Sequence, residues 1–264
     1  MKFNGKVKVV RKTHLNEEVF QIAIERQAAM GVIKPGQFFN IVASKNGYPL
    51  LRRPISVSSF DGESVEFTIK IIGSGTNALS QVCVDDEIEV MGPLGNGFDL
   101  EAYENEGKRL LVVGGGIGVA PIKGLVEALS NSNHEIDVII GFRDLPYLDN
   151  ELKKHSQNLI VVSENDASYV LGYVTQPFES ALKSRAYDMI FACGPDIMLN
   201  KLAAIANGSG NKIQLLMEEK MACGIGACLV CTCKTREGDF GFKHVRMCKE
   251  GPVFYGSEVI FDEA

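Results

Sequence analysis

The chain has 264 residues, of which 45% are hydrophobic and 23% charged, a balance typical of a globular protein with two or three domains. Its formal net charge of −6 argues against binding to nucleic acid or to an anionic membrane, because both partners favour a basic surface. No stretch approaches the ~20 apolar residues of a membrane-spanning helix. The first residues, MKFNGKVKVVRK, lack the apolar core of a secretory signal, and the seven cysteines are mostly clustered, so we expect a cytoplasmic protein.

Residues 1–102 are predicted to form an antiparallel β-barrel. Six short segments are rich in Val, Ile and Phe, and several of them alternate polar with apolar residues: VKVVRKTHL, VFQIAIERQ, GQFFNIVAS, PISVSSF, VEFTIKII and DEIEVMGPLG. Gly and Pro separate the segments, as at Pro35-Gly36 and Gly92-Pro93. Many short strands at regular spacing predict a closed barrel.

Two segments of this barrel indicate a phosphate-bearing cofactor. In LLRRPISVSSF, Arg52 and Arg53 lie among apolar residues, where an arginine is costly unless it meets an anion, and guanidinium groups match phosphate geometry. Further along, Gly73-Ser74-Gly75-Thr76 follows a predicted strand and offers backbone N–H donors. Salt bridges and a plain turn explain each segment alone, but their combination favours cofactor binding.

A charged linker at residues 101–108 precedes a region in which strands and helices alternate. The predicted strands are RLLVVGGG, EIDVIIGF, NLIVVSEN and YDMIFACGP, and the predicted helices are IKGLVEALSNS, LDNELKKHS, TQPFESALKSR and DIMLNKLAAIANG. This alternation is typical of a parallel α/β sheet, which we assign to residues 103–212.

Two loops of this region are candidates for nucleotide binding. Where the first strand meets the first helix, the glycines are Gly114, Gly115, Gly116 and Gly118. A helix N-terminus offers free N–H groups to a pyrophosphate, and glycine allows its close approach. The pattern G-x-G-x-x-P departs from the usual fingerprint, and a tight turn is the alternative, but the strand–turn–helix context favours a nucleotide. Cys193-Gly194-Pro195 follows another strand and should face the same crevice, although a buried free cysteine is the simpler alternative.

Residues 213–264 are predicted to form a small iron–sulfur domain. Cys223, Cys228, Cys231 and Cys248 follow the spacing C-x4-C-x2-C, then sixteen residues, then C, which is typical of a plant-type 2Fe–2S site. Structural zinc and disulfides are the alternatives, but a second C-x2-C knuckle is lacking and the expected compartment is reducing. Cys233 is a fifth local thiol that spacing alone does not exclude as a ligand.

The motifs R-P-I-S, G-x-G-T, GGGIGVAP and CGP together resemble the ferredoxin reductase superfamily, in which a flavin-binding barrel precedes a pyridine-nucleotide domain. The resemblance implies that FAD is bound by Arg53, Pro54, Ile55, Ser56, Lys70, Ile71, Ile72, Gly75 and Thr76. It implies that NAD is bound by Gly114, Gly115, Gly116, Gly118, Cys193, Gly194 and Pro195. NAD is preferred to NADP mainly on this resemblance, since Arg143, a candidate for a 2′-phosphate, is followed directly by Asp144.

Over the whole chain, LLRRPIS, GPLGNGF, GGGIGV, MACGIGAC and the C-x-x-GPVF ending resemble the electron transfer subunits of type B dihydroorotate dehydrogenases. The resemblance implies that the metal ligands are Cys223, Cys228, Cys231 and Cys248, with Cys233 a spare thiol. It further implies that an FMN-containing dihydroorotate dehydrogenase catalytic subunit, in a heterotetramer of two of each chain, passes electrons through the 2Fe–2S cluster and FAD to NAD+ in pyrimidine (UMP) biosynthesis.

No acid–base or nucleophile constellation stands out in the sequence, so we assign no catalytic residue to this chain. A ferredoxin–NAD(P) oxidoreductase or a hydrogenase electron-transfer subunit has the same build and is the main alternative. A zinc-stabilised binding module is an alternative of a different class.

Overall fold

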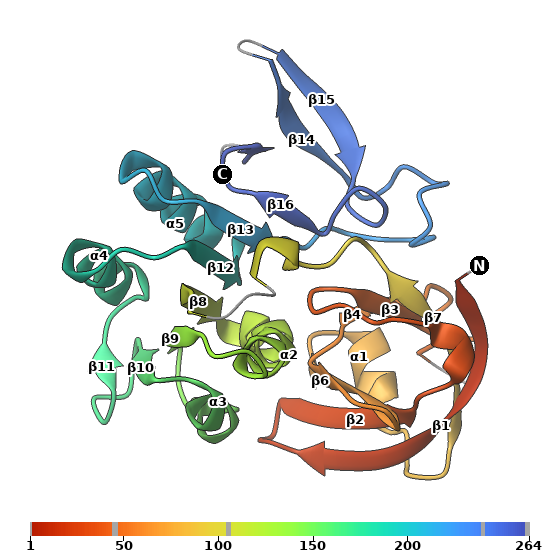
Figure 1. Ribbon diagram of the computed structural model, residues 1–264. Coiled ribbons are helices and arrows are strands. Elements are labelled where there is room, and N and C mark those ends of the chain that lie inside the picture. Colours follow the sequence, from red (N-terminus) through yellow and green to blue (C-terminus); the bar gives the residue numbers. More distant parts are fainter. Residues whose placement is uncertain (1, 44–46, 104–106, 239–240, 262–264) are drawn as a thin grey trace.

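The computed structural model describes residues 2–43, 47–103, 107–238 and 241–261. They form a seven-stranded antiparallel sheet, a second seven-stranded sheet flanked by helices, and a small three-stranded sheet. In Figure 1 the antiparallel sheet lies at the right, the helix-flanked sheet at the left and the small sheet at the top. Within the described residues, no helix is both long and apolar enough to cross a membrane.

The antiparallel sheet is built from the segments predicted as strands in the first hundred residues. Its strands, in spatial order, are β4 (Arg53–Ser56), β3 (Phe38–Ile41), β7 (Glu87–Leu94), β1 (Phe3–His14), β2 (Val19–Glu25), β6 (Ser64–Lys70) and β5 (Ser59–Phe60). The core contains large aromatic side chains, and the Phe39 and Phe67 rings meet edge to face with centroids 5.6 Å apart. The short helix α1 (Ser74–Leu79) follows β6.

This sheet is a curled half-barrel, whereas the sequence predicted a closed barrel. Its edge strands β4 and β5 are consecutive in the chain, and Val57 and Ser58 cross between the two edges. The Val57 N–H donates to the Gln37 carbonyl and the Ser58 N–H to the Glu66 carbonyl, both at 2.9 Å. A two-residue crossing therefore joins the edges where a closed barrel would have a continuous ladder.

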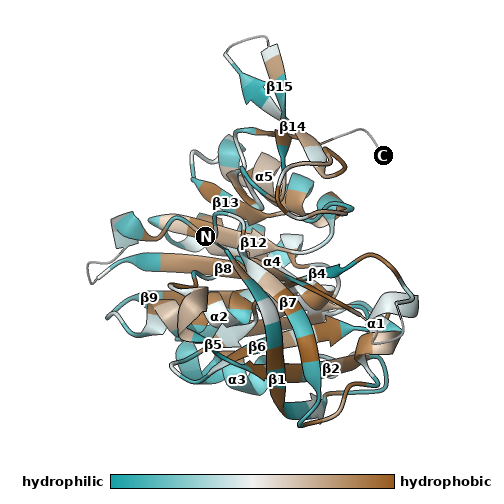
Figure 2. Cartoon of the chain, turned by 90° about the vertical axis from the view of Figure 1, so that its right-hand side faces the viewer, coloured by the Kyte–Doolittle hydropathy of each residue, from teal (hydrophilic) through white to brown (hydrophobic). Residues whose placement is uncertain are grey.

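The second sheet confirms the predicted alternation of strands and helices. Its strands, in spatial order, are β11 (Val170–Leu171), β10 (Asn158–Ser163), β9 (Glu135–Phe142), β8 (Arg109–Gly115), β12 (Met189–Cys193), β13 (Ile213–Leu216) and β16 (Val253–Tyr255). All neighbouring pairs are parallel except β13 with β16. Figure 2 shows that β8 and β12 are mainly hydrophobic, as expected for strands covered on both faces.

Helices cover both faces of this sheet. They are α2 (Val119–Ser130), α3 (Asp149–His155), α4 (Thr175–Ser184) and α5 (Asp196–Gly208). Leu110 and Val112 of β8 share a core with α2 and α3, whereas Leu111 and Val113 share a core with α4 and α5. Successive side chains of β8 thus point to opposite faces of the sheet and pack against the helices on each side.

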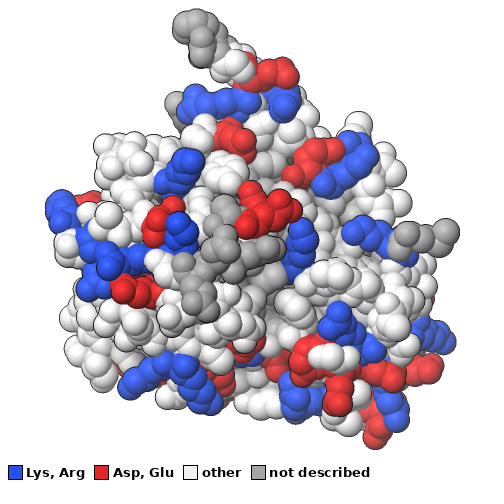
Figure 3. All heavy atoms as spheres, in the orientation of Figure 1, with Lys and Arg blue, Asp and Glu red and all other residues white. Residues whose placement is uncertain are grey.

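The C-terminal segment contributes to two sheets. Strands β13 and β16 complete the helix-flanked sheet, and β14 (Thr232–Glu237), β15 (Gly241–Arg246) and β17 (Val259–Ile260) form the small sheet. The division of the chain at residues 102 and 212 stays a prediction, and residues 104–106 of the predicted linker lie outside the described residues. Figure 3 shows acidic and basic side chains interspersed over the visible face.

Candidate cofactor sites

The residues predicted to bind FAD lie in strand β4, at the end of β6 and in the turn that leads into α1. Arg53–Ser56 form the half-buried edge strand β4, and Gly75 and Thr76 lie in the first turn of α1. The structure brings these two segments into contact. Gly75 lies so close to the Arg53 guanidinium that a Cβ atom at position 75 would overlap it. The Oγ1 atom of Thr76 accepts the N–H groups of Ile72, at 2.9 Å, and Gly73, at 3.3 Å, and so shapes the turn.

The two arginines of the LLRRPIS segment have different partners. Arg52 forms a salt bridge with Glu89, as the simpler interpretation of the sequence expected. Arg53 donates to the Leu51 carbonyl at 2.7 Å, and no carboxylate pairs with it among the described residues. The Arg53 guanidinium is therefore the better candidate for an anionic group such as a cofactor phosphate.

Apolar side chains are exposed around this edge. Leu50 is 85% and Ile72 is 78% exposed, and Leu51 and Tyr48 are also exposed. A bound aromatic cofactor would cover such a surface. Lys70 and Ile71 complete the predicted set: Lys70 forms an ion pair with Glu18 at 3.2 Å, and the Ile71 N–H donates to the Glu18 carbonyl.

The two loops predicted to bind NAD lie side by side at the carboxyl ends of neighbouring strands. Strand β8 ends at Gly115, strand β12 ends at Cys193, and Gly114 lies opposite Cys193 in the parallel ladder. A Cβ at Gly118 would lie 2.5 Å from the Cys193 carbonyl oxygen, so only glycine allows this approach of the two backbones. Helices α2 and α5 begin directly after these loops and direct their N-termini to this edge.

Two acidic residues at the same edge were not singled out from the sequence. Asp196 begins α5, and Glu218 follows β13. Desolvation by the surrounding protein and the Asp196 carboxylate both raise the pKa of Glu218, and desolvation raises the pKa of Asp196. Burial and Glu218 raise the pKa of the Cys193 thiol, so Cys193 is protonated at neutral pH. Their position just beyond the ends of β12 and β13 was the signal that could have indicated them.

The four cysteines predicted as metal ligands lie in the loop before β14 and in the turn after β15. Backbone N–H groups of Ile225, Ala227 and Cys228 are directed at the Cys223 sulfur, with the Cys228 nitrogen at 3.4 Å. Burial alone would raise the pKa of Cys223, but these donors outweigh it and lower that pKa to about 6. Gly224 and Gly226 have φ values of +70° and +82°, as a tight loop around a bulky group requires.

The thiols are arranged as two pairs. In the first pair Cys228 helps to lower the pKa of Cys223, and in the second pair, both of whose members are buried, burial followed by Cys231 raises the pKa of Cys248 to about 12. Within the described residues, no group of three or more His, Cys, Asp or Glu side chains surrounds a single metal position. The four thiols supply the number of ligands that a 2Fe–2S cluster needs, two thiolates for each iron.

Comparisons with known proteins agree with this geometry. Residues 218–260 match the family model for the iron–sulfur cluster binding domain of dihydroorotate dehydrogenase B. The chain is 37% identical over 256 residues to the dihydroorotate dehydrogenase B (NAD(+)), electron transfer subunit of Clostridium acetobutylicum, covering 97% of each chain. It is 38% identical to the subunit of that name from Clostridium perfringens, covering 98% of each chain. The chain belongs to the family of dihydroorotate dehydrogenase B (NAD+) electron transfer subunits.

Solved structures place this subunit among ferredoxin reductase-like folds. An NADH-dependent reduced ferredoxin-NADP oxidoreductase superposes with a TM-score of 0.82 and 28% identity, covering 96% of this chain and 89% of that one. A ferredoxin NADP+ reductase from Neisseria gonorrhoeae with bound FAD and NADP shares the fold, with a TM-score of 0.64 and 18% identity, and covers 78% of this chain. The predicted family and electron transfer role are thus confirmed, and the predicted cofactors agree with these matches.

Proposed function

We propose that this subunit carries electrons from a dihydroorotate-oxidising partner, through a 2Fe–2S cluster and FAD, to NAD+. The spatial order of the three candidate sites supports the proposal most directly. Strand β6, which leads into the FAD segment, lies against the Gly116–Gly118 turn of the nucleotide loop. On the other side, Asn40 of β3, next to β4, donates to the carbonyl of Cys223. The flavin edge therefore lies between the nucleotide loops and the cysteine loop.

Each site contributes binding and orientation. Bound FAD supplies the conversion between hydride transfer and single-electron transfer. Arg53 would bind its phosphate, the turn at Gly75 and Thr76 would support it, and the Gly114–Gly118 loop would receive the NAD+ pyrophosphate. The N–H groups around Cys223 favour the thiolate form that an iron ligand must take.

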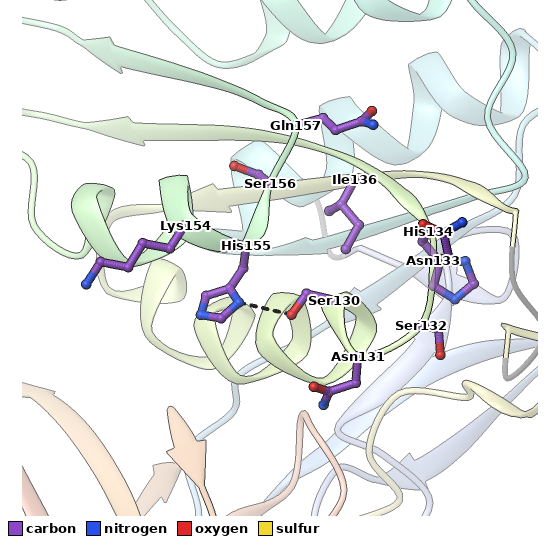
Figure 4. A pocket seen from close by; sticks show the side chains of 10 residues that line it. All are labelled: Ser130, Asn131, Ser132, Asn133, His134, Ile136, Lys154, His155, Ser156 and Gln157. Atoms are coloured by element: carbon purple, nitrogen blue, oxygen red, sulfur yellow. Dashed lines mark hydrogen bonds between the residues drawn. The ribbon is translucent and has the colours of Figure 1, made fainter.

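Dihydroorotate oxidation is assigned to the partner, which we propose to carry FMN and to assemble with this chain as a heterotetramer of two of each in the cytoplasm. A hollow of about 460 Å³ lies at the C-terminal ends of α2 and α3 (Figure 4). His155 points to Ser130 there, with 3.0 Å between Nδ1 and Oγ. The glycine loop is at the opposite end of α2, about 18 Å away for a twelve-residue helix, so this hollow is not part of the cofactor sites.

A reaction with ferredoxin is the second candidate, because the ferredoxin-NADP oxidoreductase neighbour matches nearly the whole chain. The purified chain, loaded with FAD and assayed alone, should reduce an artificial acceptor such as dichlorophenolindophenol with NADH. It should not oxidise dihydroorotate, because the sites described are all cofactor sites. Dihydroorotate turnover by the chain alone would contradict the proposal, and NADH-dependent reduction of ferredoxin at a rate matching the artificial acceptor would favour the second candidate.

A further inference from the structure

Asn40 is a fully buried polar side chain in the hydrophobic strand β3. It is 0% exposed and lies between Phe39 and Ile41, which are also buried. A buried amide is costly unless its polar atoms are paired. Its Nδ2 atom donates to the Cys223 carbonyl at 3.3 Å, but its Oδ1 atom has no hydrogen-bond partner among the described residues.

The amide joins two segments that are distant in the sequence. In the antiparallel ladder Asn40 is directly opposite Pro54, the second residue of the R-P-I-S segment, so the two side chains lie on one face of the sheet. On the cluster side, a Cβ at Gly224 would overlap the Asn40 Nδ2 atom. The cysteine loop therefore packs directly on this amide, and Gly224 is required for that approach.

Stability alone does not account for an amide at this position. A buried carbonyl oxygen without a partner costs about 1–3 kcal/mol, and native proteins seldom keep one without a further role. Among the described residues, the amide bonds to the backbone of Cys223, the first predicted ligand of the cluster. Because electronic coupling decays with the separation of two redox centres, a link between the flavin strand and this ligand bears on the rate of transfer.

We propose that Asn40 is a positioning residue that holds the Cys223 loop against the flavin-binding strand and so determines how fast single electrons pass between FAD and the cluster. The inference rests on the proposed function, since it requires both cofactors to be bound. It adds a specific residue, outside the predicted cofactor-binding sets, through which the half-barrel orients the cluster.

The test compares Asn40→Leu and Asn40→Ala with Gln37→Leu in the FAD- and cluster-loaded chain. Asn40→Leu keeps the volume and removes the donor, and Asn40→Ala avoids overfilling the site if leucine prevents folding. Gln37 is a matched control, because it is a buried amide of the same region whose Nε2 donates to the Gly95 carbonyl at 2.9 Å and not to the cysteine loop.

Rapid mixing with NADH separates flavin reduction from the later reduction of the cluster, and electron paramagnetic resonance reports the cluster's environment. Both Asn40 variants should reduce FAD at the wild-type rate but transfer electrons to the cluster about tenfold more slowly, because even a misplacement of about 1 Å can lower a rate by up to about a hundredfold. Their cluster spectrum should also change, whereas Gln37→Leu should alter neither property.

Unchanged cluster reduction and an unchanged cluster spectrum in both Asn40 variants would overturn the inference. So would an equal slowing in Gln37→Leu, because the effect would then follow from any loss of a buried amide. The wild-type chain keeps the two proposals distinguishable. If the wild-type chain binds no cluster or is not reduced by NADH, the proposed function fails. If the wild-type chain binds the cluster and is reduced by NADH, but the Asn40 variants behave identically, only the role of Asn40 fails.

Discussion

Replacing Cys231 by serine should give a protein that binds FAD but no longer holds an iron–sulfur cluster. Cys231 is 2% exposed and lies beside the buried Cys248, so its loss removes one thiol from an enclosed pair. The candidate FAD residues lie in the half-barrel and include no cysteine, so the change removes none of them. Iron and acid-labile sulfide analysis should show near-complete loss of both, while the flavin absorption bands remain.

Cys233→Ser is the matched control for this variant. Cys233 lies in β14 opposite Val245, outside the two thiol pairs, and burial raises its pKa to about 11. The serine variant should keep its iron, its sulfide and its NADH-dependent activity. The ligand set is wrong if Cys233→Ser loses the cluster while Cys231→Ser keeps it.

Replacing Lys123 by methionine should lower the free energy of unfolding by about 3 kcal/mol, because it leaves the buried Glu66 carboxylate without its buried cation and with only the exposed Arg11 beside it. Lys123 of α2 is 7% exposed and forms ion pairs with Glu66 of β6 at 2.9 Å and with Glu127 at 3.1 Å. Burial would lower the pKa of Lys123, but the two carboxylates outweigh it and hold that pKa above its ordinary value. The ion pair between Lys123 and Glu66 therefore joins the half-barrel to α2, the helix that follows the glycine loop.

Arg11→Met provides the control, since Arg11 contacts the same Glu66 carboxylate at 2.9 Å but its side chain is 58% exposed. Its loss should cost less than about 1 kcal/mol, as for exposed ion pairs. Urea denaturation monitored by flavin release and by circular dichroism measures both variants. The raised pKa of Lys123 means that its contribution persists through neutral pH and is lost only as the pH rises through that pKa. Equal effects of the two variants at pH 7 would contradict this account.

Local patterns were sufficient to predict most elements of the fold. The segment EIDVIIGF coincides with β9, and DIMLNKLAAIANG coincides with α5, because a buried parallel strand and a helix each leave a distinct hydrophobic pattern over a few residues. The cysteine loop was predicted on the same basis, since its ligand spacing and its glycines are close together in the chain. Local patterns do not report long-range pairing.

The features that the sequence did not reveal depend on residues far apart in the chain. The crossing of Val57 and Ser58 between the edges of the half-barrel depends on the carbonyls of Gln37, just before β3, and Glu66, in β6. The packing of Asn40 against Gly224 spans more than 180 positions, since Asn40 donates to residue 223. Such contacts are set by tertiary packing, so the FFNI segment resembled any other buried strand before the fold was known.

The central claim is that one chain holds FAD and a 2Fe–2S cluster and connects them to a dihydroorotate-oxidising partner. The most direct test is to purify the chain anaerobically from the organism that produces it. The purified protein is then analysed for flavin, iron, sulfide and zinc. The account predicts one FAD, two irons and two sulfides per chain, together with a co-purifying FMN protein that reduces NAD+ with dihydroorotate. A colourless protein that contains zinc and lacks flavin would contradict it.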